Sequence, residues 1–543
     1  MSGSGREFPR RVVAGRGGMS RRDLLKTLGI GVPGAYLLAG CTPSAAPTFP
    51  APNHADPDPV PFVDGVMAGD PLPDGSVIWT RVQAPAGGAP VGVLWSVSTD
   101  PSFATVAAGG VATASADGDH CVHVLVDGLE PDRWYWYRFE ADGVASRSGR
   151  LRTAPAPGAT VDSLRFAFSS CQQLNPSWFV AHRAAAAEPD LDFFMHLGDY
   201  VYVSDTGTQT LGDYRDVYHR WRRDPLLRDF HATVPMIAMW DDGEFYNGVD
   251  KFGPPARLAA ARRAWFENMP MINDGADTVY RNVGWGSLAD IPMIDVRSHR
   301  DPYLDSGDFT QGQGLTAYDP ARSQFGPEQY TWLVDQLSSS TADWRIVGNG
   351  VPISPWRLLN EEFLRPFRPD LPPNAGQYIR SDGWDDYMVE RRNLLQAILD
   401  AGVDNTVFAT GQTHIAIASE LRTDPDAGGP VAAFEFVSQS MTADPDIKKS
   451  LLGGLPSDVA SAALRVAETW LMNQNPGMRH LNFEQQGYVL VDLDPDEMVV
   501  TYRHIDTYDP DAEAWTGSTF RVAKGAQHIE VLQHRDDAGS IHE

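Results

Sequence analysis

Two patterns of hydrophobic and polar positions divide the chain near residue 154. From Phe62 to about Thr153, short segments rich in β-branched and aromatic residues are separated by turn residues such as Asp74-Gly75. After the Pro- and Ala-rich residues 154–158, apolar runs alternate with Ala-, Arg- and Leu-rich stretches at helical spacing. The first pattern predicts a small all-β sandwich, and the second predicts an α/β domain built in layers.

Five apolar runs of the second part end in glycine or polar residues. The runs cover residues 164–168, 191–197, 235–240, 344–347 and 405–409, and they lead into Ser169, Gly198, Asp241, Gly348 and Thr410. Functional groups of α/β domains gather at the carboxyl ends of the strands, so we expect these five ends to form one site. Together they offer a thiol, carboxylates, an amide, a phenol and a histidine.

The first 41 residues have the pattern of an export signal. Six arginines precede the mostly apolar run Leu24–Gly40, which is too short and too interrupted by Gly and Pro for a stable membrane span. Residues 20–26, Ser-Arg-Arg-Asp-Leu-Leu-Lys, resemble a twin-arginine signal, and Leu38-Ala39-Gly40-Cys41 resembles a bacterial lipobox. We expect export by the twin-arginine pathway to the cell envelope, with a lipid anchor at Cys41, or secretion.

The composition of the chain predicts the domain boundaries and argues against two classes of binding partner. We predict a linker at residues 42–60, a β-sandwich domain at 61–154, a catalytic domain at 160–525 and a tail at 526–543. With 44 basic and 71 acidic residues, the formal charge of −27 disfavours nucleic acid and anionic membranes as partners, apart from a lipid anchor. We expect a monomer. On so acidic a protein, a negatively charged substrate such as a phosphate ester would need a local positive field, for which bound cations are the obvious source.

The strand-end residues suit phosphoester hydrolysis with two metal ions. That reaction needs a carboxylate that bridges ions about 3.5–4 Å apart, with further ligands on either side. The metals position the phosphate, neutralise its charge and lower the pKa of bound water to roughly 7, so no protein nucleophile is required.

Eight short motifs occur in order along both parts of the chain: Gly65–Pro71, Trp79-Thr80-Arg81, Ser170-Cys171-Gln172, Gly198–Tyr202, Trp240-Asp241-Asp242, Asp295-Val296-Arg297, Trp384–Tyr387 and Asn475-Pro476. In the order and spacing of these motifs, the chain resembles the PhoD-type alkaline phosphatases, a branch of the calcineurin-like metallophosphoesterases. The resemblance implies a layered β-sandwich flanked by helices, preceded by a small all-β sandwich domain. It also implies a small phosphoester substrate.

The resemblance also implies a metal-ligand set around Asp199, which would be the bridging carboxylate. Cys171 and Tyr202 would bind a ferric ion as thiolate and phenolate, and His414 would complete that half of the site. The chemistry agrees, because a thiol with a pKa of about 8.5 and a phenol with a pKa of about 10 ionise readily only against a strong Lewis acid. Asp242 would hold the second metal, calcium or another divalent ion. The expected catalytic residues are Asp199, Asp242 and His414.

Taken alone, each of these residues also has an ordinary structural explanation. Cys171 would serve as a small buried apolar side chain, Tyr202 as a core aromatic and Asp242 as a helix cap. His196, inside its strand, is expected to be structural.

Four positions depart from the family pattern, and all four lie outside the expected iron ligands. They are Gly243 in place of His in Asp-Asp-His-Glu, Gln412 in place of Asp in Gly-Asp-x-His, Gly350 in place of Gln and Gly477 in place of His. Gln412 would still offer the metal an oxygen but without a negative charge, which should weaken a divalent site. The three glycines would leave space for a bulkier diester, and His219, His231 or Tyr246 would be candidates to replace the lost imidazole.

The sequence is therefore compatible with two functions. The first is an exported metal-dependent hydrolase of phosphomonoesters or phosphodiesters that uses metal-activated water. The alternative, motivated by the four departures, is a degenerate exported lipoprotein that binds metal or phosphate without turnover.

Overall fold

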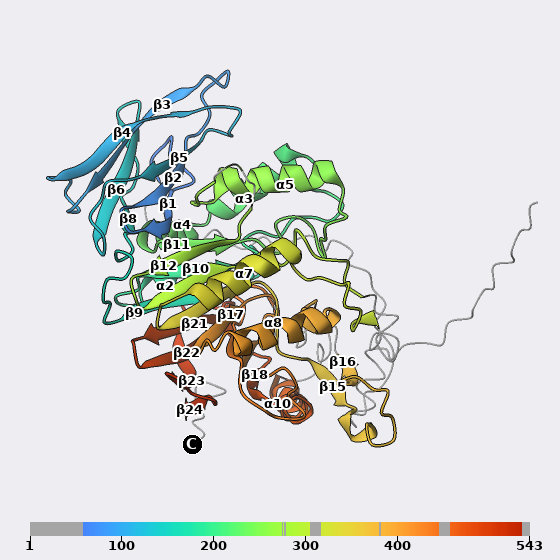
Figure 1. Cartoon of the computed structure of the whole chain (residues 1–543). Coiled ribbons are helices and arrows are strands. Elements are labelled where there is room, and N and C mark those ends of the chain that lie inside the picture. Colours follow the sequence, from blue (N-terminus) through green and yellow to red (C-terminus); the bar gives the residue numbers. More distant parts are fainter. Residues whose placement is uncertain are drawn as a thin grey trace, which may run out of the picture.

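Two large β-sheets, each carrying helices, form the main body of the molecule (Figure 1). The computed structural model describes residues 58–534, except 274, 276–277, 305–315, 379–381 and 445–456. The predicted export signal, the lipobox cysteine Cys41, most of the predicted linker and the end of the predicted tail lie outside the described residues. None of the helices in the described part of the chain is long and apolar enough to cross a membrane.

The first sheet has ten strands in the order β24-β23-β22-β21-β9-β10-β11-β1-β2-β5. Their bounds are β1 Val66–Leu72, β2 Gly75–Arg81, β5 Cys121–Val126, β9 Leu164–Ser169, β10 Phe193–Leu197, β11 Met236–Met239, β21 Gln486–Leu493, β22 Glu497–Ile505, β23 Trp515–Ala523 and β24 Glu530–Gln533. Strands β9, β10 and β11 run parallel to one another, so their carboxyl ends lie at the same edge of the sheet.

The second sheet has seven strands in the order β12-β13-β14-β17-β19-β18-β20. Their bounds are β12 Arg281–Trp285, β13 Ala289–Met293, β14 Trp344–Asn349, β17 Thr406–Thr410, β18 Ala416–Leu421, β19 Ala433–Val437 and β20 Met478–Asn482. Strands β13, β14, β17 and β19 are parallel. A two-stranded hairpin, β15 (Arg357–Asn360) and β16 (Gly376–Tyr378), lies beyond this sheet (Figure 1).

Helices cover the two sheets and give the layered order. They are α2 Val180–Ala186, α3 Leu211–Arg222, α4 Pro225–Thr233, α5 Pro255–Asn268, α7 Pro327–Ser339, α8 Met388–Asp400 and α10 Ser457–Gln474, with 3₁₀ turns η2 Glu362–Leu364 and η3 Trp384–Asp386. Helices α7 and α8 pack on the second sheet, where Leu333 and Leu394 share a core cluster with Phe408. Local signals start the helices, since Asp224 caps α4 by accepting from two backbone N–H groups ahead of Pro225.

The predicted N-terminal all-β sandwich is present, and it is joined to the main body through one of its own sheets. A five-stranded sheet, β3 (Val91–Ser98), β4 (Val106–Ala114), β6 (Trp134–Ala141), β7 (Val144–Ala145) and β8 (Gly149–Arg152), shares a core with β1, β2 and β5. Strand β1 in turn pairs in parallel with β11 at Gly69 and Met236. A Cβ at Gly69 would lie 2.7 Å from the Met236 carbonyl oxygen, so this close approach requires glycine.

The layered α/β architecture agrees with the expectation from sequence, and one detail corrects it. All five predicted strands of the catalytic part form, as β9, β10, β11, β14 and β17. The C-terminal tail expected from residue 526 instead contains β24, which adds to the first sheet beside β23 because its Val531 pairs with Phe520. The other boundaries of the predicted domains stay predictions.

Candidate metal centre

The predicted site residues meet where strands of both sheets end. Cys171 follows β9, Asp199 follows β10, Asp242 follows β11, and Gln412 and His414 follow β17. Backbone hydrogen bonds tie neighbouring loops together. The N–H of Cys171 donates to the Gly198 carbonyl at 3.1 Å, and that of Gln412 donates to Ser170 Oγ at 3.1 Å, which links the two sheets.

Four of these residues adopt left-handed backbone conformations. Cys171 has φ 63°, Asp199 has φ 55°, Gln412 has φ 78° and His414 has φ 58°. Such a conformation costs a residue other than glycine about 1–3 kcal/mol and persists only where the surrounding structure enforces it. The same loops therefore hold strain at the positions where sequence predicts metal ligands.

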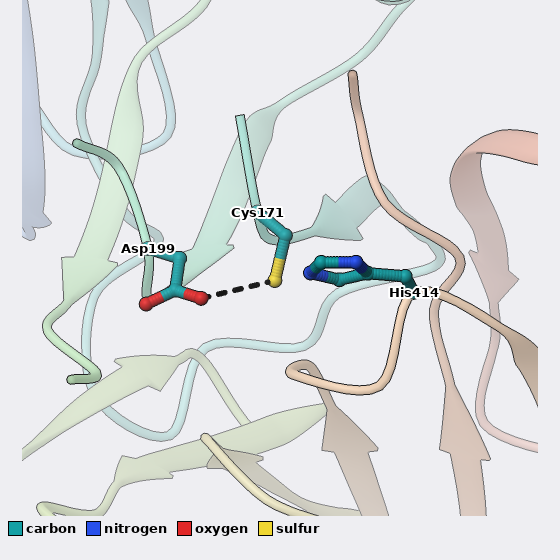
Figure 2. Close-up of side chains that lie close together, drawn as sticks. All are labelled: Cys171, Asp199 and His414. Atoms are coloured by element: carbon teal, nitrogen blue, oxygen red, sulfur yellow. Dashed lines mark hydrogen bonds between the residues drawn. The ribbon is translucent and has the colours of Figure 1, made fainter. Parts of the chain in front are cut away.

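One side of the Asp199 carboxylate, here called the cysteine half, contains Cys171, Tyr202 and His414. Cys171 Sγ lies 3.4 Å from Asp199 Oδ2, and the ring of His414 faces the same sulfur (Figure 2). Tyr202 Oη lies 3.2 Å from His414 Nε2. One ligand atom each from Cys171, Asp199 and His414 lie within 4.8 Å of one another, which is a suitable spacing around a single ion.

The imidazole of His414 is held in an orientation suited to a metal ligand. Its Nδ1 lies 2.8 Å from the carbonyl oxygen of Asp444, an arrangement that places the proton on Nδ1 and leaves the Nε2 lone pair facing the site. Metal-binding histidines commonly use a carbonyl or carboxylate in this way to fix their tautomer.

The acidic groups of the cysteine half fit a highly charged cation. Burial and the neighbouring Asp199 carboxylate raise the pKa of the Cys171 thiol, and the same two causes raise the pKa of the Tyr202 phenol. Burial, together with Asp242 and Asp241, raises the pKa of Asp199. These groups would ionise together only against a strong positive charge, and thiolate, phenolate and imidazole are suitable ligands for a transition metal such as iron.

The other side of Asp199, here called the carboxylate half, contains Asp241, Asp242 and Gln412. Asp199, Asp241 and Asp242 each place an oxygen within 4.8 Å of the others, so three carboxylates are close enough to share an ion. A buried arginine already lies among them. Arg297 forms two hydrogen bonds with Asp241, the one from Nη2 at 2.8 Å, and Nη2 lies 3.7 Å from Asp242 Oδ1.

Gln412 is bonded to this ion pair. With its amide oriented to satisfy its neighbours, it donates to Asp241 and accepts from Arg297 Nη2 at 3.1 Å. Asp242 accepts the N–H of Gly248 through Oδ2 at 2.6 Å. The polar groups of the carboxylate half are therefore engaged with one another and with the backbone.

The buried carboxylate of Glu244 positions these loops. This residue is not among the site residues expected from the sequence. Glu244 accepts the N–H of Tyr200 at 2.6 Å through one oxygen, and the N–H groups of Asp199 and Asp241 at 3.2 and 2.9 Å through the other. Glu244 thus fixes the backbone on both sides of Asp199. Its position directly after Asp241-Asp242-Gly243 was the available signal in the sequence.

The expectation of extra space at the three glycines is wrong. A Cβ at Gly243 would lie 2.5 Å from Asp199 Oδ1, and one at Gly350 would lie 2.8 Å from Val296 Cγ2. A Cβ at Gly477 would lie 2.6 Å from the carbonyl oxygen of Glu420, at the start of β20. Atoms of neighbouring residues occupy the space beside each glycine, so the glycines do not open a larger substrate cavity.

The three side chains considered as replacements for the lost imidazole make structural contacts instead. His231 bonds to the Tyr200 hydroxyl at 2.7 Å, and His219 pairs with Asp119 of the N-terminal sandwich. Tyr246 packs against the guanidinium of Arg257, 4.4 Å from the ring centroid.

Comparison with known proteins covers almost the whole chain. The PhoD-like phosphatase family matches residues 166–502, and the N-terminal domain of PhoD-like phosphatases matches residues 46–155. The chain is 31% identical to alkaline phosphatase D of Bacillus subtilis (strain 168) over 529 residues, which span 90% of this chain and 85% of that protein.

Two solved structures are also similar. A structure of PhoD matches with a TM-score of 0.75 and 29% identity, over 90% of this chain and 95% of the other. Purple acid phosphatase from yellow lupin (Lupinus luteus) seeds matches with a TM-score of 0.51 and 11% identity, over 84% and 73% of the two chains, and so shares the fold. On this sequence and structural similarity, the chain belongs to the PhoD-like phosphatase family.

Proposed function

We propose that the protein is an exported, metal-dependent phosphoester hydrolase. The observation that carries the proposal is the convergence of Cys171, Asp199, Tyr202 and His414 at the strand ends of a phosphatase fold. Four potential ligands from three separate loops meet around one point. If one of them served only as a buried core side chain, there would be no reason for the other three to gather beside it.

Cys171, Tyr202 and His414 would hold a ferric ion together with Asp199. When bound, such an ion supplies positive charge for the phosphate and lowers the pKa of coordinated water. The chain's own contribution is to orient the ligands. Asp199 Oδ1 accepts the N–H of Gly243 at 2.7 Å while Oδ2 faces Cys171, so the carboxylate lies between the two halves of the site.

The export part of the proposal rests on the sequence of the first 41 residues. The twin-arginine route carries folded proteins and suits an enzyme that acquires its metal before export. We propose that the monomeric enzyme acts in the cell envelope through a lipid at Cys41, or after secretion, on small phosphoesters.

Hydrolysis of p-nitrophenyl phosphate and bis(p-nitrophenyl) phosphate by the natively exported protein tests the proposal. We expect release of p-nitrophenol from at least one ester, lost on chelation and restored when the metal is returned. Gln412 and Gly243 favour a second candidate, a protein that binds metal or phosphate without turnover. Tight phosphate binding by metal-replete protein that is inactive on both esters would support that candidate and contradict the hydrolase.

A further inference from the structure

Arg297 is a fully buried cation at the point where the family resemblance places a second metal. It lies in the loop after β13, and none of its surface is exposed. Its Nε and Nη2 atoms contact the two oxygens of Asp241, and Nη2 also lies 3.7 Å from Asp242. The guanidinium therefore offsets part of the negative charge that would otherwise attract a divalent ion.

A second layer of charges holds this guanidinium in place. Asp382 accepts from Arg297 Nη1 at 2.5 Å and from Arg300 Nη1 at 2.6 Å, and both arginines are fully buried. Removing a buried guanidinium from such a network would leave uncompensated carboxylates, which is strongly unfavourable. Arg297 is thus a fixed part of the carboxylate half.

Gln412 adapts the site to this arginine. Its amide offers an N–H to Asp241 and an oxygen to Arg297, a pair of contacts that fits the ion pair on both sides. A carboxylate at this position would add a negative charge facing Asp241, which an additional cation would have to offset. The uncharged amide adds no negative charge to the carboxylate half, where Arg297 already supplies positive charge.

Arg297 belongs to a motif shared with the family, so the difference in this chain lies in the missing negative charge at position 412. We propose that Gln412 leaves Arg297 as the cation that balances Asp241 and Asp242, so that the centre binds one tightly held ion, in the cysteine half. This inference deepens the proposed function and rests on its metal centre. Arg297 is buried and acts through Asp241 and Asp242, so it is a positioning residue. It fixes these carboxylates and supplies part of the positive charge that a second ion would otherwise bring.

Metal content and calcium response of the full-length exported protein test this inference. We expect wild-type protein equilibrated with calcium to retain one metal ion per chain and to show no calcium-dependent rise in Tm. Arg297→Gln should be destabilised, bind a second ion and regain Tm as calcium is added. Arg300→Gln, which also loses a buried ion pair to Asp382 but none to Asp241, is the matched control and should show no calcium response.

Gln412→Asp keeps Arg297 and covers the case in which Arg297→Gln does not fold. Because added ligand charge tightens calcium sites, it should bind calcium about tenfold more tightly than wild type. Two tightly bound ions per wild-type chain would overturn the role of Arg297 but leave the hydrolase intact. One ion in wild type without a gain in either variant would also overturn it. Wild-type protein without any metal would overturn the proposed function as well.

Discussion

Replacing Asp199 with asparagine is expected to lower kcat/KM for p-nitrophenyl esters by about 10³-fold or more, a loss typical of removing charge stabilisation at a reacting centre. The carboxylate has one oxygen 3.4 Å from Cys171 Sγ and the other 2.7 Å from the Gly243 N–H. Asparagine keeps the shape but removes the charge that a bridging ligand supplies. Initial rates of the metal-replete variant, corrected for the folded fraction, measure the effect.

Asp70→Asn provides a matched control for that substitution. Asp70 is as buried as Asp199 and has a similar backbone conformation, with φ 48° against 55°. Asp70 lies in β1, where its carboxylate pairs with Arg281 and accepts the N–H of Ile272 at 2.9 Å. We expect Asp70→Asn to lose stability but keep its rate per folded molecule. An equal loss of rate per folded molecule in both variants would show that the effect of the Asp199 substitution is not specific to the candidate site.

Replacing Glu244 with glutamine is expected to lower both stability and hydrolysis. Both oxygens of Glu244 accept backbone N–H groups, so either orientation of a glutamine amide directs an NH₂ group at a buried N–H. A buried donor without a partner costs about 1–3 kcal/mol, and we therefore expect the free energy of unfolding to fall by roughly 2–4 kcal/mol. The rate should fall too, because Glu244 fixes the backbone of Asp199. Denaturant titration and initial rates measure the two effects.

Glu435→Gln separates positioning from stability. Glu435 in β19 is equally buried and accepts the N–H groups of Ile353 and Ser354, each at 2.8 Å, and the hydroxyl of Thr410. We expect a similar loss of stability with a much smaller loss of rate. If Glu244→Gln hydrolyses esters as fast as wild type once folded, Glu244 has no positioning role.

The strands that build the site could be predicted because their signals are local. Each of the five runs is a short apolar segment buried on both faces, and each ends in residues that favour turns. Since these strands are parallel within their sheets, the order of their ends along the chain was enough to expect Cys171, Asp199 and His414 together. The choice of candidate ligands among the residues at these strand ends rests on motifs, and so on family resemblance rather than on periodicity.

The charge arrangement of the carboxylate half could not be predicted because it depends on contacts between distant segments. Arg297 and Asp241 are 56 positions apart and follow strands of different sheets. Sequence marked Arg297 as part of a motif but gave no reason to place it beside Asp241. In the same way, a small residue such as Gly243 suggests space, whereas its neighbours have closed around it.

A visible absorption spectrum of the natively exported protein tests the central claim most directly. If Cys171, Asp199, Tyr202 and His414 hold a ferric ion, the phenolate of Tyr202 should give an iron charge-transfer band. The Tyr202→Phe variant, which loses only the hydroxyl that lies 3.2 Å from His414 Nε2, should fold and lack the band. A metal-replete wild-type protein without the band, or a band unchanged in Tyr202→Phe, would contradict this account.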